Sequence, residues 1–275
     1  VIDRTLESPD TWEVNLSKGG DKKATFERLL RERKMGGLAF LRNLRNMIEA
    51  RVDESLIRDR FNGPFKYVLP FRFIAAARHA PRFEDVIESA MLRQCAEAPY
   101  LPGTTALIVD TSPSMWDDKI SEKSELLRFD AAAALAIIMR ERCESVHVWA
   151  FNTRAYEIKP RRGFALRDEL AKTKEGASCG GLAVEAANAR GYDRVIVLTD
   201  GQWHVLRQGE SMATMSTPVG NAKDVSPAPL TEKAYMVNLA PYKYGFTTDK
   251  WRNVDGFSER ILDFITAFEA ESDAP

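Results

Sequence analysis

Two aspartates and two serines are spaced along this chain so that together they can bind a divalent cation. Asp110 ends a short apolar run, and Ser112 and Ser114 follow it in Asp-Thr-Ser-Pro-Ser. Asp200 ends a later apolar run, in Leu-Thr-Asp-Gly. Carboxylate and hydroxyl oxygens suit a hard ion such as Mg²⁺, which keeps several waters in its shell. The residues therefore predict a metal site with one open position, where an outside carboxylate or other anion completes the coordination.

The elements that carry these residues are predicted to be parallel strands. Short apolar runs alternate with helical segments, which predicts an α/β fold with a doubly wound, mostly parallel sheet covered on both faces. Ligands of such sheets bind beyond the carboxyl ends of the strands, and both aspartates lie at such ends. The expected strands are 104–109, 146–151, 156–158, 195–198 and 234–239, and the expected helices are 127–142, 182–189 and 257–268. The polar segment 207–233, with three prolines, is expected to be a long loop.

The metal motif resembles the metal-ion-dependent adhesion site of von Willebrand factor A domains, whose pattern is Asp-x-Ser-x-Ser, then a Thr, then an Asp. Asp110, Ser112 and Ser114 match the first element, and Asp200 matches the last. The middle element departs from the family, because Ser178 stands where the Thr is expected. Serine keeps the hydroxyl, so the resemblance implies a site of Asp110, Ser112, Ser114, Ser178 and Asp200.

Two other interpretations of these residues remain open. Asp110 and the serines can simply cap a turn and the following helix. His204 with Ser114 and Asp110 can be imagined as a hydrolytic triad, but no nucleophile elbow accompanies them. Cys179 lies beside the site, and we interpret it as a small buried filler and not as a nucleophile. We therefore expect no enzymatic activity.

The first part of the chain is predicted to be all helical. Leu38, Leu41, Leu44 and Ile48 recur at steps of three and four, which places them on one helix face. Asp53 is expected to cap the next helix, and Pro70 to open another. Short amphipathic helices in succession suggest stacked helical hairpins.

Charge is distributed unevenly around a net value of -1. Residues 18–82 hold 16 Lys and Arg against 7 Asp and Glu, whereas residues 83–275 are acidic overall. A basic segment is a reason to consider a polyanionic partner, although a solvated helical surface with salt bridges explains the charge equally well. The candidate phosphate contacts, taken from charge alone, are Arg42, Arg45, Lys66, Arg72, Arg78 and Arg82.

The cysteines and the hydropathy of the sequence indicate where in the cell the protein is expected. Three widely spaced cysteines form neither a disulfide framework nor a zinc pattern, so we expect a reducing, cytoplasmic location. No apolar run is long enough to span a bilayer, and we expect no membrane association.

The first hundred residues resemble the TROVE module of the Ro family of RNA-binding proteins. The resemblance rests on the motifs Thr-Trp-Glu-Val at 11–14, Lys-Met-Gly at 34–36, Leu-Arg-Asn-Leu-Arg-Asn-Met at 41–47 and Leu-Pro-Phe-Arg at 69–72. It implies a partial HEAT-like helical segment over residues 1–100 and a von Willebrand factor A-like domain over 103–275. It also implies binding of structured or misfolded non-coding RNAs, Y RNAs among them, in a ribonucleoprotein.

A complete ring of the Ro family needs several hundred residues of helical repeats, and only the last part is present in this sequence. Either another chain completes the ring, or the first part is missing, or this is a compact form. We expect a non-enzymatic RNA-binding protein that also carries a magnesium site. The alternative is a protein-interaction module without RNA binding, whose metal grips an acidic residue of a partner.

Overall fold

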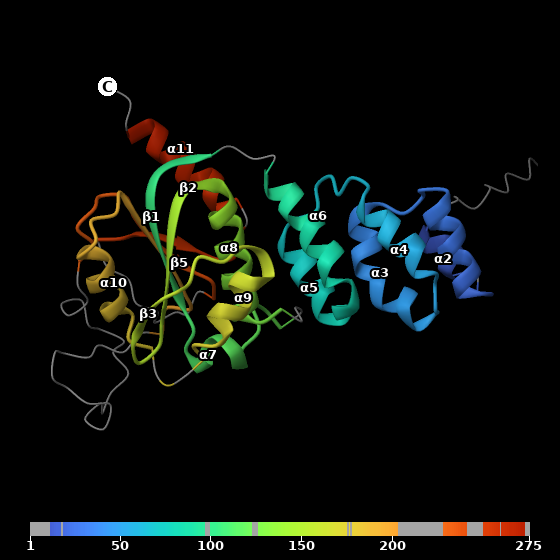
Figure 1. Ribbon diagram of the computed structural model, residues 1–275, viewed down its shortest axis with the longest axis horizontal. Helices are drawn as coiled ribbons and strands as arrows, with labels where there is room; N and C mark the ends of the chain where they lie inside the picture. Colours follow the sequence, from blue (N-terminus) through green and yellow to red (C-terminus); the bar gives the residue numbers. More distant parts are fainter. Residues whose placement is uncertain are drawn as a thin grey trace, which may run out of the picture. The chain divides into compact units, whose positions relative to one another are not determined.

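The protein is described by a computed structural model, which covers residues 12–17, 19–96, 100–122, 126–174, 176, 178–202, 228–240, 250–258 and 260–272. The chain divides into two compact units, Val1–Gln94 and Cys95–Pro275. The first is helical and the second is built on a sheet (Figure 1). Most of the predicted loop, residues 203–227, lies outside the described residues.

The helical unit consists of short helices in succession. They are α1 (Trp12–Ser17), α2 (Lys22–Arg31), α3 (Gly37–Glu49), α4 (Glu54–Phe61), α5 (Phe71–His79), the 3₁₀ turn η1 (Pro81–Phe83) and α6 (Glu84–Ala96). Asp21 caps α2, because its carboxylate accepts hydrogen bonds from the backbone amides of Lys23 and Ala24. Asp53 caps α4 through the amide of Ser55, as the sequence predicts. Pro70 directly precedes α5, also as predicted.

Alternate helices of this unit pack on one another. α2 packs against α4, and α3 packs against α5, which is the two-layered arrangement expected of stacked helical hairpins. Phenylalanines fill the layer between them. The rings of Phe40 and Phe61 lie 4.9 Å apart, and those of Phe65 and Phe73 lie 5.0 Å apart. The predicted helix is present as α3, which contains Leu38, Leu41, Leu44 and Ile48. Leu41 and Leu44 are buried and Leu38 is 40% exposed, and Phe40 and Met47 complete the buried face.

The second unit is a six-stranded sheet with helices between the strands. The strands are β1 (Leu101–Asp110), β2 (Cys143–Phe151), β3 (Ala155–Glu157), β4 (Arg194–Thr199), β5 (Ala234–Asn238) and β6 (Arg252–Asp255), in the order β3-β2-β1-β4-β5-β6. All neighbouring pairs are parallel except β2 and β3. The helices are α7 (Pro113–Asp117), α8 (Arg128–Arg142), α9 (Gly163–Ala171), α10 (Gly180–Asn188) and α11 (Ile261–Ser272).

Helices cover both faces of this sheet (Figure 1). On one face, α10 buries Ala183, Val184 and Ala187 against Ile108 and Val197 of the central strands. On the other face α8 packs against β1 and β2. Four successive alanines, residues 131–134, are fully buried in α8, and these small side chains let the helix approach the sheet closely.

The predicted fold class, a doubly wound and mostly parallel α/β sheet with an all-helical segment before it, is confirmed. Every predicted strand and helix of the second unit is present, with ends shifted by a few residues. The predicted elements did not include the short helix α7, the helix α9 or the exposed edge strand β6. Among the described residues, no helix combines the length and apolar character needed to cross a membrane.

Candidate functional site

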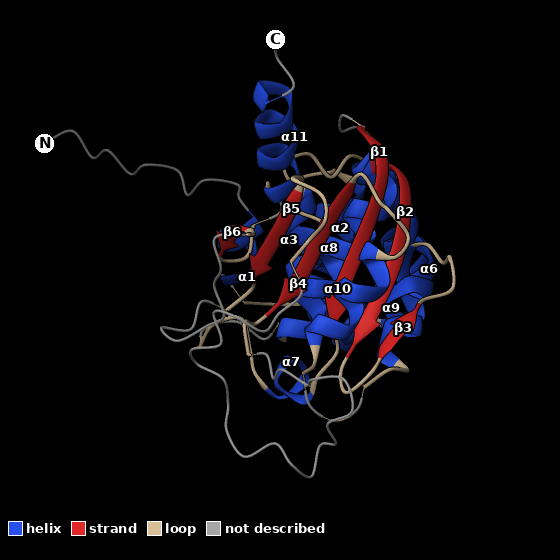
Figure 2. Ribbon diagram, turned by 90° about the vertical axis from the view of Figure 1, so that its left-hand side faces the viewer, coloured by secondary structure: helices blue, strands red, loops and turns tan. Residues whose placement is uncertain are grey.

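The two aspartates of the predicted metal site lie at the same edge of the sheet. Asp110 is the last residue of β1, and Asp200 directly follows β4. The strands are parallel neighbours, with Val109 paired to Leu198, so both carboxylates emerge at the carboxyl ends. In Figure 2 the arrows of β1 and β2 run toward this edge, where α7 lies. Both aspartates are completely buried.

Hydrogen bonds fix the carboxylate of Asp110 in one orientation. Its Oδ1 accepts a bond of 2.9 Å from the backbone amide of Ser112. Its Oδ2 accepts bonds from the hydroxyls of Ser178, at 3.0 Å, and Thr199, at 2.8 Å. The hydroxyl of Ser178 therefore points at Asp110, from the position that the sequence assigned to the replaced Thr. The sequence analysis did not include Thr199 among the site residues.

The hydroxyls of Ser112 and Ser114 lie side by side. Their Oγ atoms are 3.3 Å apart, and either one can donate to the other. Ser112 is the residue before α7, whose first residue is Pro113, so a tight turn presents both hydroxyls. Ser112 is buried, whereas Ser114 is partly exposed. The two hydroxyls are thus adjacent to each other, and their roles as metal ligands remain a prediction.

A buried arginine accompanies the second aspartate. Nη1 of Arg128 lies 2.7 Å from Oδ2 of Asp200 and 2.9 Å from Oδ2 of Asp118. The other oxygen of Asp200 accepts a bond from the amide of Gln202 at 3.1 Å. Arg128 opens α8, and its side chain is only 7% exposed. Sequence analysis missed this contact, although a cation in the first turn of a helix is electrostatically unfavourable and was a usable signal.

The site has an excess of buried negative charge. Burial first, and then the charge of Asp200, raise the pKa of Asp110 to about 7, and the donors Ser112 and Thr199 offset only part of this. Two buried carboxylates against a single arginine make a bound cation electrostatically favourable. Among the described residues, no group of three or more His, Cys, Asp or Glu side chains could hold a metal ion, so the candidate site relies on hydroxyls besides its two carboxylates. Hydroxyl and carboxylate oxygens suit a hard ion such as Mg²⁺.

The residues considered for enzymatic chemistry give that interpretation no support. Burial, and then the charge of Asp110, raise the pKa of the Cys179 thiol to about 11, which keeps the reactive thiolate scarce at neutral pH. His204, the third member of the imagined triad, lies outside the described residues. All three cysteines are free and buried.

The six candidate phosphate contacts are all exposed on the helical unit. Arg45 pairs with Glu49 at 2.9 Å, and Arg82 pairs with Glu54 at 2.8 Å. Arg72 lies over the ring of Phe71, with 4.5 Å between the guanidinium carbon and the ring centroid. Exposure is compatible both with RNA contacts and with a solvated surface, so the roles of these residues remain predictions.

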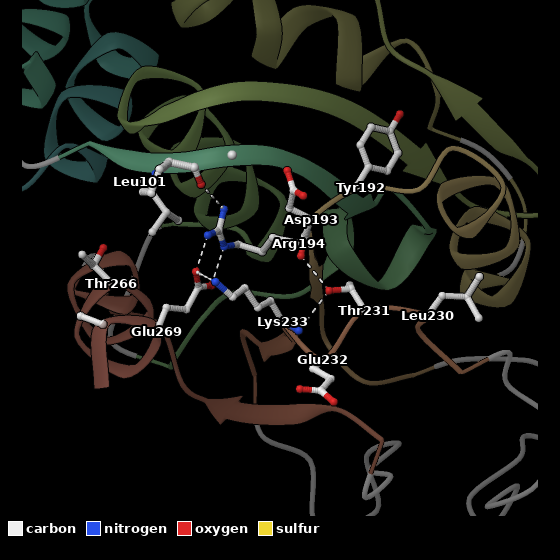
Figure 3. Close-up of a pocket in the computed structure, with 13 residues that line it drawn as sticks. Leu101, Tyr192, Asp193, Arg194, Leu230, Thr231, Glu232, Lys233, Thr266 and Glu269 are labelled. Carbon is white, nitrogen blue, oxygen red and sulfur yellow. Dashed lines mark hydrogen bonds and ion pairs between the residues drawn. The ribbon is translucent and has the colours of Figure 1, made fainter. Parts of the chain in front are cut away.

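A pocket of about 770 Å³ opens at the other end of the sheet, near the amino ends of β1 and β4 (Figure 3). Its centre is a buried ion pair, in which the guanidinium of Arg194 faces the carboxylate of Glu269 from α11 (Figure 3). Tyr235 donates its hydroxyl to the same carboxylate at 3.0 Å, and Nη1 of Arg194 donates to the hydroxyl of Thr105 at 3.0 Å. The buried polar groups bind one another, which is the pattern of a structural link between α11 and the sheet.

Fold and site together define a helical unit of stacked hairpins followed by a doubly wound α/β unit with a cation-compatible edge. The TROVE domain family model matches residues 4–57. The crystal structure of the Ro (RSR) protein of Deinococcus radiodurans matches with a TM-score of 0.52 and 17% sequence identity. The family-model match supports a TROVE-like segment over residues 4–57, and the structural match shows that the chain shares its fold with that Ro protein.

The extent of these matches is unequal. The Ro structure covers 95% of this chain, whereas this chain spans 63% of that protein. A mutant of the PilB minor pilin from Streptococcus sanguinis gives a weaker match, with a TM-score of 0.37, 11% identity, and coverage of 65% of this chain and 64% of the pilin. No curated protein gives a significant match.

Proposed function

We propose that this chain is a non-enzymatic RNA-binding protein of Ro/TROVE type, which binds structured or misfolded non-coding RNA such as Y-like RNA. The main support is the TROVE match at residues 4–57, which overlaps part of the basic segment 18–82. Lysines and arginines that contact phosphates supply affinity with little reading of sequence. The buried, free cysteines fit a reducing location, and we propose the cytoplasm.

We also propose that the edge of the sheet binds Mg²⁺ or another divalent cation. The hydroxyls of Ser112 and Ser114 would hold the ion. Asp110, Ser178 and Asp200 would supply charge and hydrogen bonds, directly or through water. A bound cation would neutralise buried negative charge and offer its open position to an anionic group. The two fully buried aspartates are the observation that supports this.

The RNA proposal predicts weaker binding when exposed cations of the helical unit are removed. The Arg72→Ala, Arg78→Ala, Arg82→Ala triple variant is expected to bind structured RNA more weakly than the wild type. The salt dependence of its binding constant should flatten by about one unit for each phosphate that the variant no longer neutralises. Filter binding at several salt concentrations measures both quantities.

A control of equal charge is available in the α/β unit. Lys159, Arg161 and Arg260 are exposed, and their triple alanine variant should bind RNA as the wild type does. An equal decrease of affinity in the two triple variants would show that only net charge matters. Wild-type affinity and an unaltered slope in the Arg72, Arg78, Arg82 variant would remove these three residues from the RNA interface.

The metal proposal predicts that Arg128 weakens cation binding. Its guanidinium already neutralises Asp200, so Arg128→Met is expected to tighten Mg²⁺ binding about tenfold, as removal of a nearby like charge should. Thermal denaturation against Mg²⁺ concentration measures the affinity. Arg142→Met is the matched control, because Arg142 is an equally buried arginine of α8 that pairs with Asp263 instead. A weaker or unaltered Mg²⁺ affinity in the Arg128→Met variant would show that the ion does not bind near Asp200.

The alternative function is a metal-dependent protein-interaction module. The partial exposure of Ser114 favours it, since an acidic residue of a partner can approach the ion from that side. The two functions separate experimentally: chelation should abolish capture of an acidic partner, and raised salt should abolish RNA binding. We further propose that another chain completes a ring, which light scattering with and without RNA will test.

A further inference from the structure

A second pocket, in the helical unit, is positively charged. It has a volume of about 360 Å³ and lies where the turn before α3 meets the loop after α4. Three cations line it, Arg33, Arg60 and Lys66, against a single acid, Asp59. Neither the metal site nor the predicted phosphate contacts, apart from Lys66, include these residues.

The guanidinium of Arg60 is held in place by contacts that, among the residues that the structure describes, include no acidic side chain. Its Nε donates to the carbonyl of Met35, and its Nη2 donates to the carbonyl of Pro64, each at 3.3 Å. The guanidinium carbon lies 4.8 Å from the ring centroid of Phe65 and 5.3 Å from that of Phe40. Within the described residues, its Nη1 is buried and has no hydrogen-bond partner. A fixed charged donor that lacks an acceptor is energetically unfavourable unless a ligand supplies one.

The other two cations of the pocket also lack an ion-pair partner among the described residues. This contrasts with much of the unit, where cations pair with carboxylates: Lys23, Arg28, Arg31, Lys34, Arg45, Arg58 and Arg82 all do so. Arg33 and Lys66 are exposed, so their charges are free to meet a ligand at the rim. Asp59 is thus the single acid of the pocket against three cations, and no ion pair among the described residues neutralises Arg33, Arg60 or Lys66.

The amino end of α3 adds backbone donors to the same pocket. Gly36 precedes this helix of 13 residues, and no side chain caps it. The first amides of a helix have no partner within it, and the helix dipole favours an anion at this end. Gly37 has to be a glycine, because a Cβ atom there would lie 2.8 Å from the ring of Phe65. Gly36 and Gly37 both line the pocket, and without side chains they leave the backbone accessible.

An exposed aromatic ring stands next to this pocket. Tyr67 follows Lys66, is 85% exposed, and adopts a left-handed backbone conformation with φ of 62°. Nζ of Lys66 lies 5.2 Å from the centroid of its ring. An exposed aromatic ring beside a cationic groove is the arrangement on which single-stranded nucleic acids stack their bases.

We infer that the pocket of Arg33, Arg60 and Lys66 binds a phosphate group of a single-stranded RNA segment, and that Tyr67 stacks on a neighbouring base. This inference rests on the proposed RNA-binding function and assigns that function a site. Phosphate oxygens would accept from the guanidinium and from the amides of α3, and Arg33 and Lys66 would neutralise the charge.

The test uses a single-stranded uridine decamer and the full chain, in filter binding at several salt concentrations. Arg33 lies at φ of 52°, where glycine is unstrained, so Arg33→Gly removes the charge without disturbing the turn. Arg51 is a matched control, since it is an exposed arginine with φ of 56° that does not line the pocket. Arg33→Gly and Lys66→Gln should each weaken binding about tenfold and flatten the salt slope by about 0.7, whereas Arg51→Gly should change neither.

Tyr67→Asn separates stacking from charge. Asn tolerates the left-handed conformation, so the turn should survive the change. Binding should weaken about fivefold or more with an unaltered salt slope, because a stacked base contributes no counterion release. The inference is overturned if Arg33→Gly weakens binding no more than Arg51→Gly does, or if Tyr67→Asn has no effect.

Inorganic phosphate distinguishes failure of this inference from failure of the proposed function. Phosphate should raise the melting temperature of the wild type more than chloride of equal ionic strength, and this difference should vanish in Arg33→Gly. If RNA does not bind but phosphate still raises the melting temperature more than chloride does, the proposed RNA function is wrong and the pocket is a phosphate site. If RNA binds and the pocket variants leave its affinity unaltered, the RNA function is supported and this inference is wrong.

Discussion

Glu269→Ala is expected to lower the free energy of unfolding of the α/β unit by about 3–5 kcal/mol. The side chain of its partner, Arg194, is 2% exposed, so removal of the carboxylate leaves a buried charge without compensation. Tyr235 is deprived of the acceptor of its hydroxyl as well. Although burial opposes it, the bond and charge of Arg194 hold the pKa of Glu269 below its usual value. The pair therefore stabilises the ionised state, and that stability is lost as the pH falls through this lowered pKa.

Denaturant titration measures this effect, and thermal denaturation should show a midpoint lower by roughly 10 °C. Glu271→Ala is the control, because Glu271 is an exposed carboxylate of the same helix. Replacement of both partners, as Arg194→Met with Glu269→Leu, should restore most of the stability, since no charge is then left buried. A single variant as stable as the wild type would show that the pair is solvated in solution.

Asp110→Asn is expected to make the metal-free protein more stable than the wild type at pH 8. The pKa of Asp110 in the folded state is about 7, well above the ordinary aspartate value of 3.8. Between these values the folded state binds more protons than the unfolded state, so the free energy of unfolding falls as the pH rises. This contribution is fully present below about pH 4 and lost by pH 7, and it amounts to about 4 kcal/mol. Asn carries no charge and avoids this destabilisation.

Magnesium should reverse that order of stability. The ion needs the ionised carboxylate, so Mg²⁺ should stabilise the wild type at pH 8 and leave Asp110→Asn unaltered. Thermal denaturation at pH 5 and pH 8, with chelator and with Mg²⁺, gives the four comparisons. Asp117→Asn, an exposed change in the neighbouring helix, should follow the wild type throughout. If Mg²⁺ raises the melting temperature of Asp110→Asn as much as that of the wild type, the ion does not bind at Asp110.

The order of strands and helices in the α/β unit was predictable because apolar runs mark buried parallel strands. Ala106–Val109 is buried from both faces, so this part of β1 is apolar throughout and its end at Asp110 is unambiguous. β6 is an exposed edge strand with no such pattern, and it was missed for that reason. On α3, helical spacing alone selected Leu38, although which residues become buried depends on the neighbouring helix.

In the candidate site, contacts between residues near in sequence were predictable, whereas contacts between distant residues were not. Asp110, Ser112 and Ser114 are close in sequence, and their geometry follows from one turn. Arg128 reaches Asp200 across a sequence separation of 72 residues, and Thr199 reaches Asp110 across 89. Contacts of this range depend on strand register and on the placement of α8, which residue types do not specify.

The left-handed backbone of Arg33, Arg51 and Tyr67 bears on how this protein can be engineered. Each is an L-residue in a conformation that costs about 1 kcal/mol or more, and glycine at any of the three would relieve that strain. At Arg51, selection for heat resistance can accept the glycine freely. At Arg33 and Tyr67 the same substitution would remove a side chain that we propose contacts the ligand. A gain in stability at these two positions is therefore accompanied by a loss of ligand affinity. Libraries screened only for thermal tolerance should therefore enrich glycine at all three positions, and libraries that also demand binding should enrich it at Arg51 alone.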